Sequence, residues 1–248
     1  MPAGYVLLAA PPVRAAVRAD LADALGPWLL APTFALPAAA EPIATGRGGA
    51  HRVTLPGGVR AVVRPYRRGG LVARLVHETY LGIRPRPLRE LAVTVEARRR
   101  GVATAEVLAA RVEGRLAYRG VLVTAEVPDA APLLDALRAL ARGEARRALA
   151  ARAGAAVAGL HDAGVAHADL NLNNILVQRT AEGVVPVFVD FDRARLAPSP
   201  LGTAGRRRNL RRLARSLAKL DPSGTVAGAD EARAFHAAYE TARRACGS

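Results

Sequence analysis

The first half of the chain alternates apolar and polar residues in short runs, a pattern typical of half-buried strands. Residues 51–63 contain two such runs around the turn Pro56-Gly57-Gly58, and residues 105–127 contain two more around Glu113-Gly114. Proline and glycine between β-rich runs favour tight turns. The pattern therefore predicts two β-hairpins.

Helical spacing replaces this alternation in three places. Residues 85–100 begin around Pro87 and stop before Gly101, which are common helix start and stop signals. Residues 131–163 are rich in alanine and leucine, which are good helix formers, with a glycine interrupting near Gly143. Residues 207–220 repeat leucine every three or four positions, with arginines between them. We predict helices in all three segments.

These elements divide the chain into three segments. We expect residues 1–40 to be an N-terminal extension with little structure of its own. Residues 41–127 are expected to form a lobe of strands with one helix, and residues 128–248 a mainly helical lobe. The predicted fold class is α+β in two lobes, with a boundary at the strand-breaking Pro128.

The balance of charge is strongly basic. The 248 residues have a formal net charge of +15, and Lys219 is the only lysine. A field of this sign attracts polyanions such as nucleic acid, an anionic membrane surface or phosphorylated ligands. Preference for arginine over lysine is typical of a GC-rich genome, but that preference does not explain the excess of base over acid.

The sequence also narrows the cellular setting. Cys246 is the single cysteine, so we expect neither an intrachain disulfide nor a cysteine-rich metal site. Residues 1–13 lack the features of a signal peptide, and the uncharged stretch at residues 26–40 is too short to span a bilayer. We expect a soluble or peripheral protein in a cytoplasmic compartment.

The candidate chemistry lies between His167 and Asp192. Asp169 and Asn174 stand in a polar segment before one short apolar strand, and Asp190 directly follows the next strand. If these two strands pair as a hairpin, both junctions lie at the same end. The three polar side chains then converge on one point.

Phosphoryl transfer requires such a set. The acceptor hydroxyl needs a carboxylate to orient it and take its proton, and the metal ions on the nucleotide phosphates need oxygen ligands. Asp169 fits the first role, whereas Asn174 and Asp190 fit the second. The spacings Asp169-x4-Asn174 and Asp190-Phe191 match the catalytic loop and the metal-binding motif of kinases. We therefore predict a protein-kinase-like fold that uses ATP and Mg²⁺, with catalytic Asp169 and Asn174.

Some of these residues have simpler interpretations. Aspartate and asparagine also punctuate turns, although this alternative does not account for the combined spacing. In loops of this kind the histidine at the position of His167 more often packs structurally than acts in catalysis. We interpret His161 as an ordinary residue near a helix C-terminus.

A kinase also needs a phosphate-covering turn and a cation held by a helical carboxylate. Gly46, Gly48 and Gly49 precede the first hairpin and are the candidate turn. The usual lysine is missing from this half of the chain, so Arg64 is the candidate replacement, since a guanidinium binds phosphate bidentately. Glu90, early in the predicted helix, is its candidate partner.

Together these residues resemble the 3-deoxy-D-manno-octulosonic acid (Kdo) kinases, within the lipopolysaccharide kinase group. The resemblance covers about residues 46–220 and rests on Arg64-Pro65-Tyr66-Arg67-Arg68-Gly69-Gly70-Leu71, Arg89-Glu90, Arg98-Arg99-Arg100-Gly101-Val102, His167-Ala168-Asp169-Leu170-Asn171-x-x-Asn174-Ile175-Leu176, Val189-Asp190-Phe191-Asp192-Arg193 and Asn209–Leu220. The catalytic loop alone is shared with protein kinases and aminoglycoside phosphotransferases. More specific are the basic Tyr-Arg-Arg-Gly-Gly run, the His-Ala-Asp-Leu-Asn form and the Asp-Phe-Asp-Arg form taken together.

The resemblance implies transfer of the ATP γ-phosphoryl group to a hydroxyl of Kdo in the lipid A inner core. The partners would be Kdo-lipid A or another anionic sugar, and an anionic membrane surface, with the enzyme peripheral on the cytoplasmic face of the inner membrane. Arg67, Arg68, Arg74 and the arginines of 206–215 would hold the acceptor, or the 206–215 segment is a packed helix with a solvated basic face. Ala168 replaces an arginine of regulated protein kinases, which fits a small-molecule kinase.

Two alternatives stay open at this point. One is a kinase-like phosphotransferase for another small molecule or a protein, because the aromatic residues common near the first lobe of the family are largely missing. The other is a basic pseudokinase or binding module without catalysis. We expect no specific nucleic acid partner, since few aromatics are present to stack bases. The sequence makes no prediction of oligomeric state.

Overall fold

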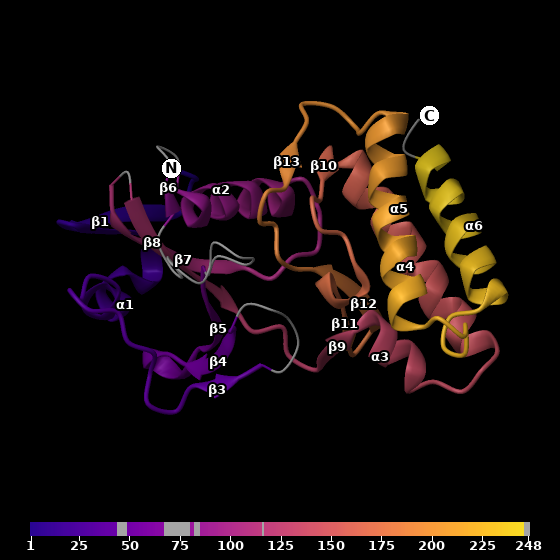
Figure 1. Ribbon diagram of the computed structural model, residues 1–248, viewed down its shortest axis with the longest axis horizontal. Helices are drawn as coiled ribbons and strands as arrows, with labels where there is room; N and C mark the ends of the chain where they lie inside the picture. The colour runs from indigo at the N-terminus through magenta and orange to yellow at the C-terminus, as the bar shows by residue number, and fades with distance from the viewer. Residues whose placement is uncertain (44–48, 67–79, 82–84, 116, 246–248) are drawn as a thin grey trace. The chain divides into compact units, whose positions relative to one another are not determined.

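The computed structural model describes residues 1–43, 49–66, 80–81, 85–115 and 117–245. The chain divides into two compact units, one of residues 1–96 and 105–126 and one of residues 97–104 and 127–248. Figure 1 shows the first unit built on a sheet and the second built mainly of helices. The predicted α+β class is confirmed.

The sheet of the first unit is antiparallel throughout, with the order β1-β2-β7-β8-β5-β4-β3, and β6 also pairs with β8. Both predicted hairpins are present, as β4–β5 and β7–β8. The elements of this unit are β1 (Tyr5–Ala10), β2 (Val13–Arg18), η1 (Ala19–Leu21), α1 (Ala22–Leu29), β3 (Glu41–Pro42), β4 (His51–Thr54), η2 (Pro56–Gly58), β5 (Arg60–Pro65), β6 (Tyr80–Leu81), α2 (Arg86–Arg99), β7 (Val107–Gly114) and β8 (Ala117–Ala125). The last turn of α2 belongs to the second unit.

The two faces of this sheet carry separate hydrophobic clusters. Val121 and Val123 of β8 pack in the cluster that includes Leu25 of α1, whereas Leu122 packs in the cluster that includes Leu91 of α2. Successive side chains of a strand point to opposite faces, so β8 supplies both clusters. The sheet is therefore covered on both faces, by α1 and by α2.

The N-terminal segment is an integral part of this sheet. β1 pairs with β2, and β2 pairs with β7. The buried Arg111 of β7 donates from Nε to the carbonyl of Leu29 and from its terminal nitrogens to Ala31 and Glu113, each at 2.9 Å. These bonds fix the end of α1 to the sheet. The structure thus differs from the expected extension at 1–40, since neither YVLLAA of β1 nor VRAAVR of β2 alternates regularly between apolar and polar residues.

The second unit contains a small sheet of order β12-β11-β9, the strand pair β10–β13, and helices that include α4, α5 and α6. α4 and α6 pack very closely, because a Cβ added at Gly154 would lie 2.1 Å from the carbonyl oxygen of Phe235. Its elements are β9 (Ala130–Pro132), α3 (Leu133–Arg138), α4 (Glu144–Asp162), β10 (Val165–Ala166), η4 (Leu172–Asn174), β11 (Ile175–Thr180), β12 (Gly183–Phe188), β13 (Arg195–Leu196), α5 (Thr203–Leu220) and α6 (Ala229–Ala245). The helices predicted at 131–163, with an interruption near Gly143, are present as α3 and α4, and residues 130–132 form the short strand β9.

Residues 97–104 anchor the end of β12. Gly101, with φ of 84°, ends α2, and the Val102 amide bonds back to the Ala97 carbonyl at 3.1 Å. The chain then passes beside Phe188, whose amide donates to the Ala103 carbonyl at 2.8 Å. This contact fixes the strand end that leads into Asp190. Across the described residues, the structure contains no helix long and apolar enough to cross a membrane.

Candidate active site

The hairpin of β11 and β12 brings Asn174 and Asp190 to the same end. The strands pair from Thr180–Gly183 to Ile175–Phe188, and beyond the last pair the Val189 amide donates to the Asn174 carbonyl at 3.0 Å. Asp190 is the next residue. The pairing expected from the sequence is confirmed. It places Asn174 and Asp190, the two candidate metal ligands, beside each other across the end of the hairpin.

Amide side chains hold Asp169 next to this hairpin end. The Nδ2 atoms of Asn174 and Asn171 both donate to the Asp169 carbonyl, at 2.8 and 3.1 Å. Asn171 also caps η4, since its Oδ1 accepts from the Asn173 and Asn174 amides at 2.9 and 3.2 Å. The backbone of Asp169 is thereby fixed while its side chain is exposed. All three predicted residues therefore lie in one connected network.

The donor atoms at this site fit a magnesium ion. Because Nδ2 of Asn174 donates to the Asp169 carbonyl, its Oδ1 is the atom left to bind a metal. Asp190 supplies carboxylate oxygens from a left-handed backbone with φ of 61°. Mg²⁺ takes oxygen ligands, and proteins usually supply only one or two of them beside substrate phosphates. An amide oxygen and a carboxylate match that requirement.

His167 connects the loop that carries Asp169 to the strand end that carries Asp190. Its ring is fully buried, with Nε2 3.0 Å from the Val189 carbonyl and Nδ1 accepting from the Asp169 amide at 3.3 Å. Burial lowers the pKa of His167, so the ring is neutral at pH 7. A carbonyl only accepts, so Nε2 carries the proton and Nδ1 accepts. The ring also packs on Phe191, at 5.1 Å between centroids. This placement agrees with the structural interpretation of His167.

One face of α5 supports the catalytic loop. Asn209 Nδ2 donates to the His167 carbonyl at 2.6 Å, and Ser216 Oγ accepts from the Leu172 amide at 3.2 Å. Asn209 and Ser216 are seven residues apart, so they share a helix face. Sequence reasoning did not select them as site residues. The sequence feature that could have indicated them is the presence of two uncharged polar residues among the regularly spaced leucines of the predicted helix.

The segment after Asp190 is held in an unusual conformation. Asp190 and Arg193 both have φ of 61°, although neither is glycine. Between them Phe191 is buried, and its carbonyl accepts from the Ala194 amide at 2.9 Å. Left-handed backbone at non-glycine residues costs free energy and clusters at functional sites. This turn sets the direction of the Asp190 side chain.

In the first unit, Arg64 and Glu90 form the ion pair that the sequence suggested. Arg64 lies on β5, and its guanidinium contacts the carboxylate of Glu90 on α2, which is 3% exposed. The Tyr66 hydroxyl donates to the same carboxylate, and the Arg64 guanidinium lies 5.0 Å from the centre of the Tyr66 ring. Tyr66 was missed as a partner. Its position in the sequence could have indicated this role, because residues two positions apart in an extended segment, such as Arg64 and Tyr66, lie on the same face.

Other predicted residues fall outside the described part of the chain. These are Gly46, Gly48, Arg67, Arg68, Arg74 and Cys246. Gly49 is described and has φ of 61°. The phosphate-covering turn proposed for Gly46, Gly48 and Gly49 therefore stays a prediction.

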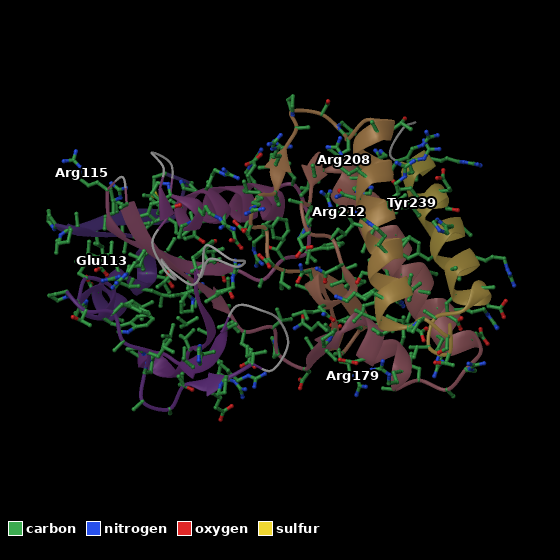
Figure 2. All side chains as sticks on the ribbon, viewed as in Figure 1. Glu113, Arg115, Arg179, Arg208, Arg212 and Tyr239 are labelled. Atoms are coloured by element: carbon green, nitrogen blue, oxygen red, sulfur yellow. The ribbon has the colours of Figure 1, made fainter. Side chains whose placement is uncertain are left out.

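His161 belongs to a buried polar cluster of the second unit, rather than being the ordinary helix-end residue expected from the sequence. Its Nδ1 lies 2.9 Å from the hydroxyl of Tyr239 on α6, which Figure 2 labels. Arg206 nearby pairs with Asp162 at 2.6 Å. Burial, followed by the charge of Arg206, lowers the pKa of His161 to about 4. His161 is thus neutral at pH 7 and stabilises the packing of α4 and α6.

Sequence comparison finds related kinases over most of the chain. A sequence model described as the lipopolysaccharide kinase (Kdo/WaaP) family matches residues 41–239. A 3-deoxy-D-manno-octulosonic acid kinase of Xanthomonas campestris pv. campestris (strain B100) is 37% identical over 202 residues, which cover 79% of this chain and 77% of the relative. A kinase of the same name from Stenotrophomonas maltophilia (strain R551-3) is 37% identical over 179 residues, covering 71% and 68%.

Structural comparison finds kinase-like folds. WaaP in complex with acyl carrier protein aligns with a TM-score of 0.56 and 19% identity, over 82% of this chain and 78% of that one. The Rio2 kinase-ADP/Mg²⁺-phosphoaspartate complex from Chaetomium thermophilum aligns with a TM-score of 0.51 and 15% identity, over 98% and 82%. At these identities the likeness concerns the fold, and it agrees with the kinase-like fold predicted from the sequence.

Proposed function

Because the chain belongs to the lipopolysaccharide kinase (Kdo/WaaP) family and is therefore a kinase, we propose that it transfers the γ-phosphoryl group of ATP to a hydroxyl of Kdo in the lipid A inner core. Relatives named 3-deoxy-D-manno-octulosonic acid kinase share 37% identity over about four-fifths of the chain. The observation that carries the proposal is the convergence of Asp169, Asn174 and Asp190 through the β11–β12 hairpin.

Asp169 is assigned to the acceptor. Its exposed carboxylate orients the hydroxyl and takes its proton as the hydroxyl oxygen forms a bond to the γ-phosphorus. The bond between the γ-phosphorus and the bridging oxygen breaks at the same time, and ADP leaves. The neutral His167 has its Nδ1 committed to the Asp169 amide, so it positions the loop and takes no proton.

Asn174 and Asp190 are assigned to magnesium, which when bound neutralises charge on the nucleotide phosphates. We assign to Arg64 the phosphate contact that a lysine makes in most kinases. The buried Glu90 and the Tyr66 hydroxyl hold the Arg64 side chain in place. A guanidinium keeps its charge at every physiological pH and binds phosphate through two parallel hydrogen bonds, so it suits this role.

A lipid acceptor requires the kinase to bind its substrate at a membrane surface. We propose that the kinase is peripheral on the cytoplasmic face of the inner membrane, because a net charge of +15 attracts an anionic leaflet. Sedimentation with vesicles tests this. We expect binding to vesicles that contain anionic lipid, little binding to neutral vesicles, and release as salt rises. Equal binding to both vesicle types would contradict the proposal.

The activity is tested with purified protein, Mg-ATP and Kdo-lipid A. We expect the mass of the lipid to increase by one phosphate, and we expect Asp169→Ala to lower kcat by about a thousandfold or more while the protein stays folded. Asp169→Asn is the matched variant, since it keeps the shape and removes the base. If the wild-type protein phosphorylates a soluble aminocyclitol or a protein instead, the family member has another acceptor and the Kdo assignment is overturned.

A further inference from the structure

The helix α5 carries seven basic residues and no acidic residue. Its inner face holds the catalytic loop through Asn209 and Ser216. Successive helical residues are rotated by about 100°, so Arg208 and Arg212 lie together on the flank next to this inner face. Arg207 and Arg211 lie on the far side. Figure 2 labels Arg208 and Arg212, one turn apart on α5.

The flanking arginines have no hydrogen-bond or ion-pair partner in the part of the chain that the structure describes. Among the described residues, neither Arg208 nor Arg212 forms a hydrogen bond or an ion pair, and the same holds for Arg207 and Arg211. Their neighbour Arg206, by contrast, pairs with Asp162 at 2.6 Å. Like charges three and four residues apart on a helix repel one another. This concentration of positive charge therefore does not stabilise α5.

Arg212 lies close to the catalytic loop. Along α5 it stands between Asn209 and Ser216, the two residues that bond the loop. Its side chain is half-buried, and its charge contributes to lowering the pKa of His167. His167 is two residues before Asp169, so an anion bound at Arg212 would lie near the hydroxyl that Asp169 orients.

We propose that Arg208 and Arg212 bind an oxyanion of the acceptor, a phosphate or a carboxylate, beside the hydroxyl that is phosphorylated. The proposal rests on the proposed function, and it adds the residues that recognise the acceptor. Two guanidinium groups one helical turn apart, about 6 Å along the axis, suit a group with several oxygens. An unpaired guanidinium keeps its donors for such a ligand.

Two double variants with the same change of charge test this proposal. The first is Arg208→Gln/Arg212→Gln on the flank of α5, and the second is Arg207→Gln/Arg211→Gln on its far side. With Kdo-lipid A as acceptor, we expect the first variant to raise the acceptor KM about tenfold or more, with kcat and the KM for ATP within twofold of wild type. The second variant should leave all three within twofold. Both should melt no lower than wild type.

Modified acceptors identify the anion. Kdo-lipid A without its lipid A phosphates, and Kdo-lipid A with its carboxyl group amidated, are compared with the intact lipid. One modification should raise the wild-type KM about tenfold, and the flank variant should show no further change with that acceptor. If the flank variant responds to each modification as wild type does, the two arginines do not bind the acceptor and the proposal is overturned.

Direct binding separates this proposal from the proposed function. The dissociation constant for intact Kdo-lipid A in neutral detergent micelles is measured without ATP for wild type and both variants. If wild type binds the lipid through the flank arginines but never phosphorylates it, the proposed function fails and this inference stands. If wild type phosphorylates the lipid and the flank variant binds it equally well, this inference fails. Equal weakening in both double variants indicates general attraction to anionic lipid and also overturns it.

Discussion

Arginine has two different environments in this chain, and the first unit and helix α5 of the second unit illustrate them. In the first unit, Arg111 is 1% exposed and donates to two backbone carbonyls and to Glu113, and Arg64 pairs with the buried Glu90. On α5 of the second unit, Arg208 and Arg212 have no such partner among the described residues. A desolvated guanidinium must be satisfied within the fold, whereas a solvated one contributes little to stability. The presence of partners thus separates arginines that the fold needs from arginines that the fold does not hold.

The largest effect on stability should follow from removing Arg111. We expect Arg111→Met to lower the free energy of unfolding by about 3 kcal/mol, because the carbonyls of Leu29 and Ala31 lose their buried donors. Chemical denaturation measures the loss, and Arg208→Gln, expected to change stability by less than about 0.5 kcal/mol, is the control. Similar losses in the two variants would remove the distinction between the two kinds of arginine.

The paired Arg206 lies beside His161, whose pKa is about 4 in the fold and 6.5 in the unfolded chain. The unfolded state therefore binds more protons between these values, and stability falls as the pH is lowered from 6.5 to about 4. The expected loss is about 3 kcal/mol, and it levels off below pH 4. His167 contributes in the same direction, so the measurement is the difference between wild type and His161→Gln across this window. Parallel curves for the two proteins would contradict the prediction.

Arg64 should affect both stability and nucleotide binding. Arg64→Leu removes the Arg64 guanidinium from the buried Glu90 carboxylate, so we expect a loss of about 2 kcal/mol and weaker binding of ATP. Adding Glu90→Gln should recover most of the stability and none of the ATP binding, since the buried charge is gone but the phosphate contact is still missing. Unfolding curves and nucleotide titration measure the two effects. Recovery of ATP binding in the double variant would show that Arg64 has no direct role.

The smallest effect is expected on the far side of α5. Arg211→Glu replaces repulsion from Arg207 and Arg215, four residues away on either side, with attraction. We expect the free energy of unfolding to rise by about 0.5 kcal/mol and kinase activity to stay within twofold of wild type. A loss of more than 1 kcal/mol in urea denaturation would mean that Arg211 has a structural partner and that the comparison between the units does not hold.

The sequence alone determined the elements that depend on neighbours along the chain. The two hairpins of the first unit follow from alternation around Pro56-Gly57-Gly58 and Glu113-Gly114, and both are present. The grouping of Asn174 with Asp190 follows from two short apolar strands with polar junctions. These signals are local, because period-2 alternation and turn residues act within a few positions. Even the Arg64–Glu90 pair was inferred from motif spacing.

Only the tertiary structure decided what depends on distant parts of the chain. Arg111 donates to the Leu29 carbonyl, 82 residues away in the sequence, and Asn209 donates to the His167 carbonyl, 42 residues away. No local sequence pattern predicts either hydrogen bond. The strands before residue 41 were missed because neither β1 (YVLLAA) nor β2 (VRAAVR) alternates regularly between apolar and polar residues. The packing of α5 also decides which of its arginines lie beside the catalytic loop, because Asn209 and Ser216 bring one face of the helix against that loop. Such contacts form when separate elements pack, and a linear pattern does not record that step.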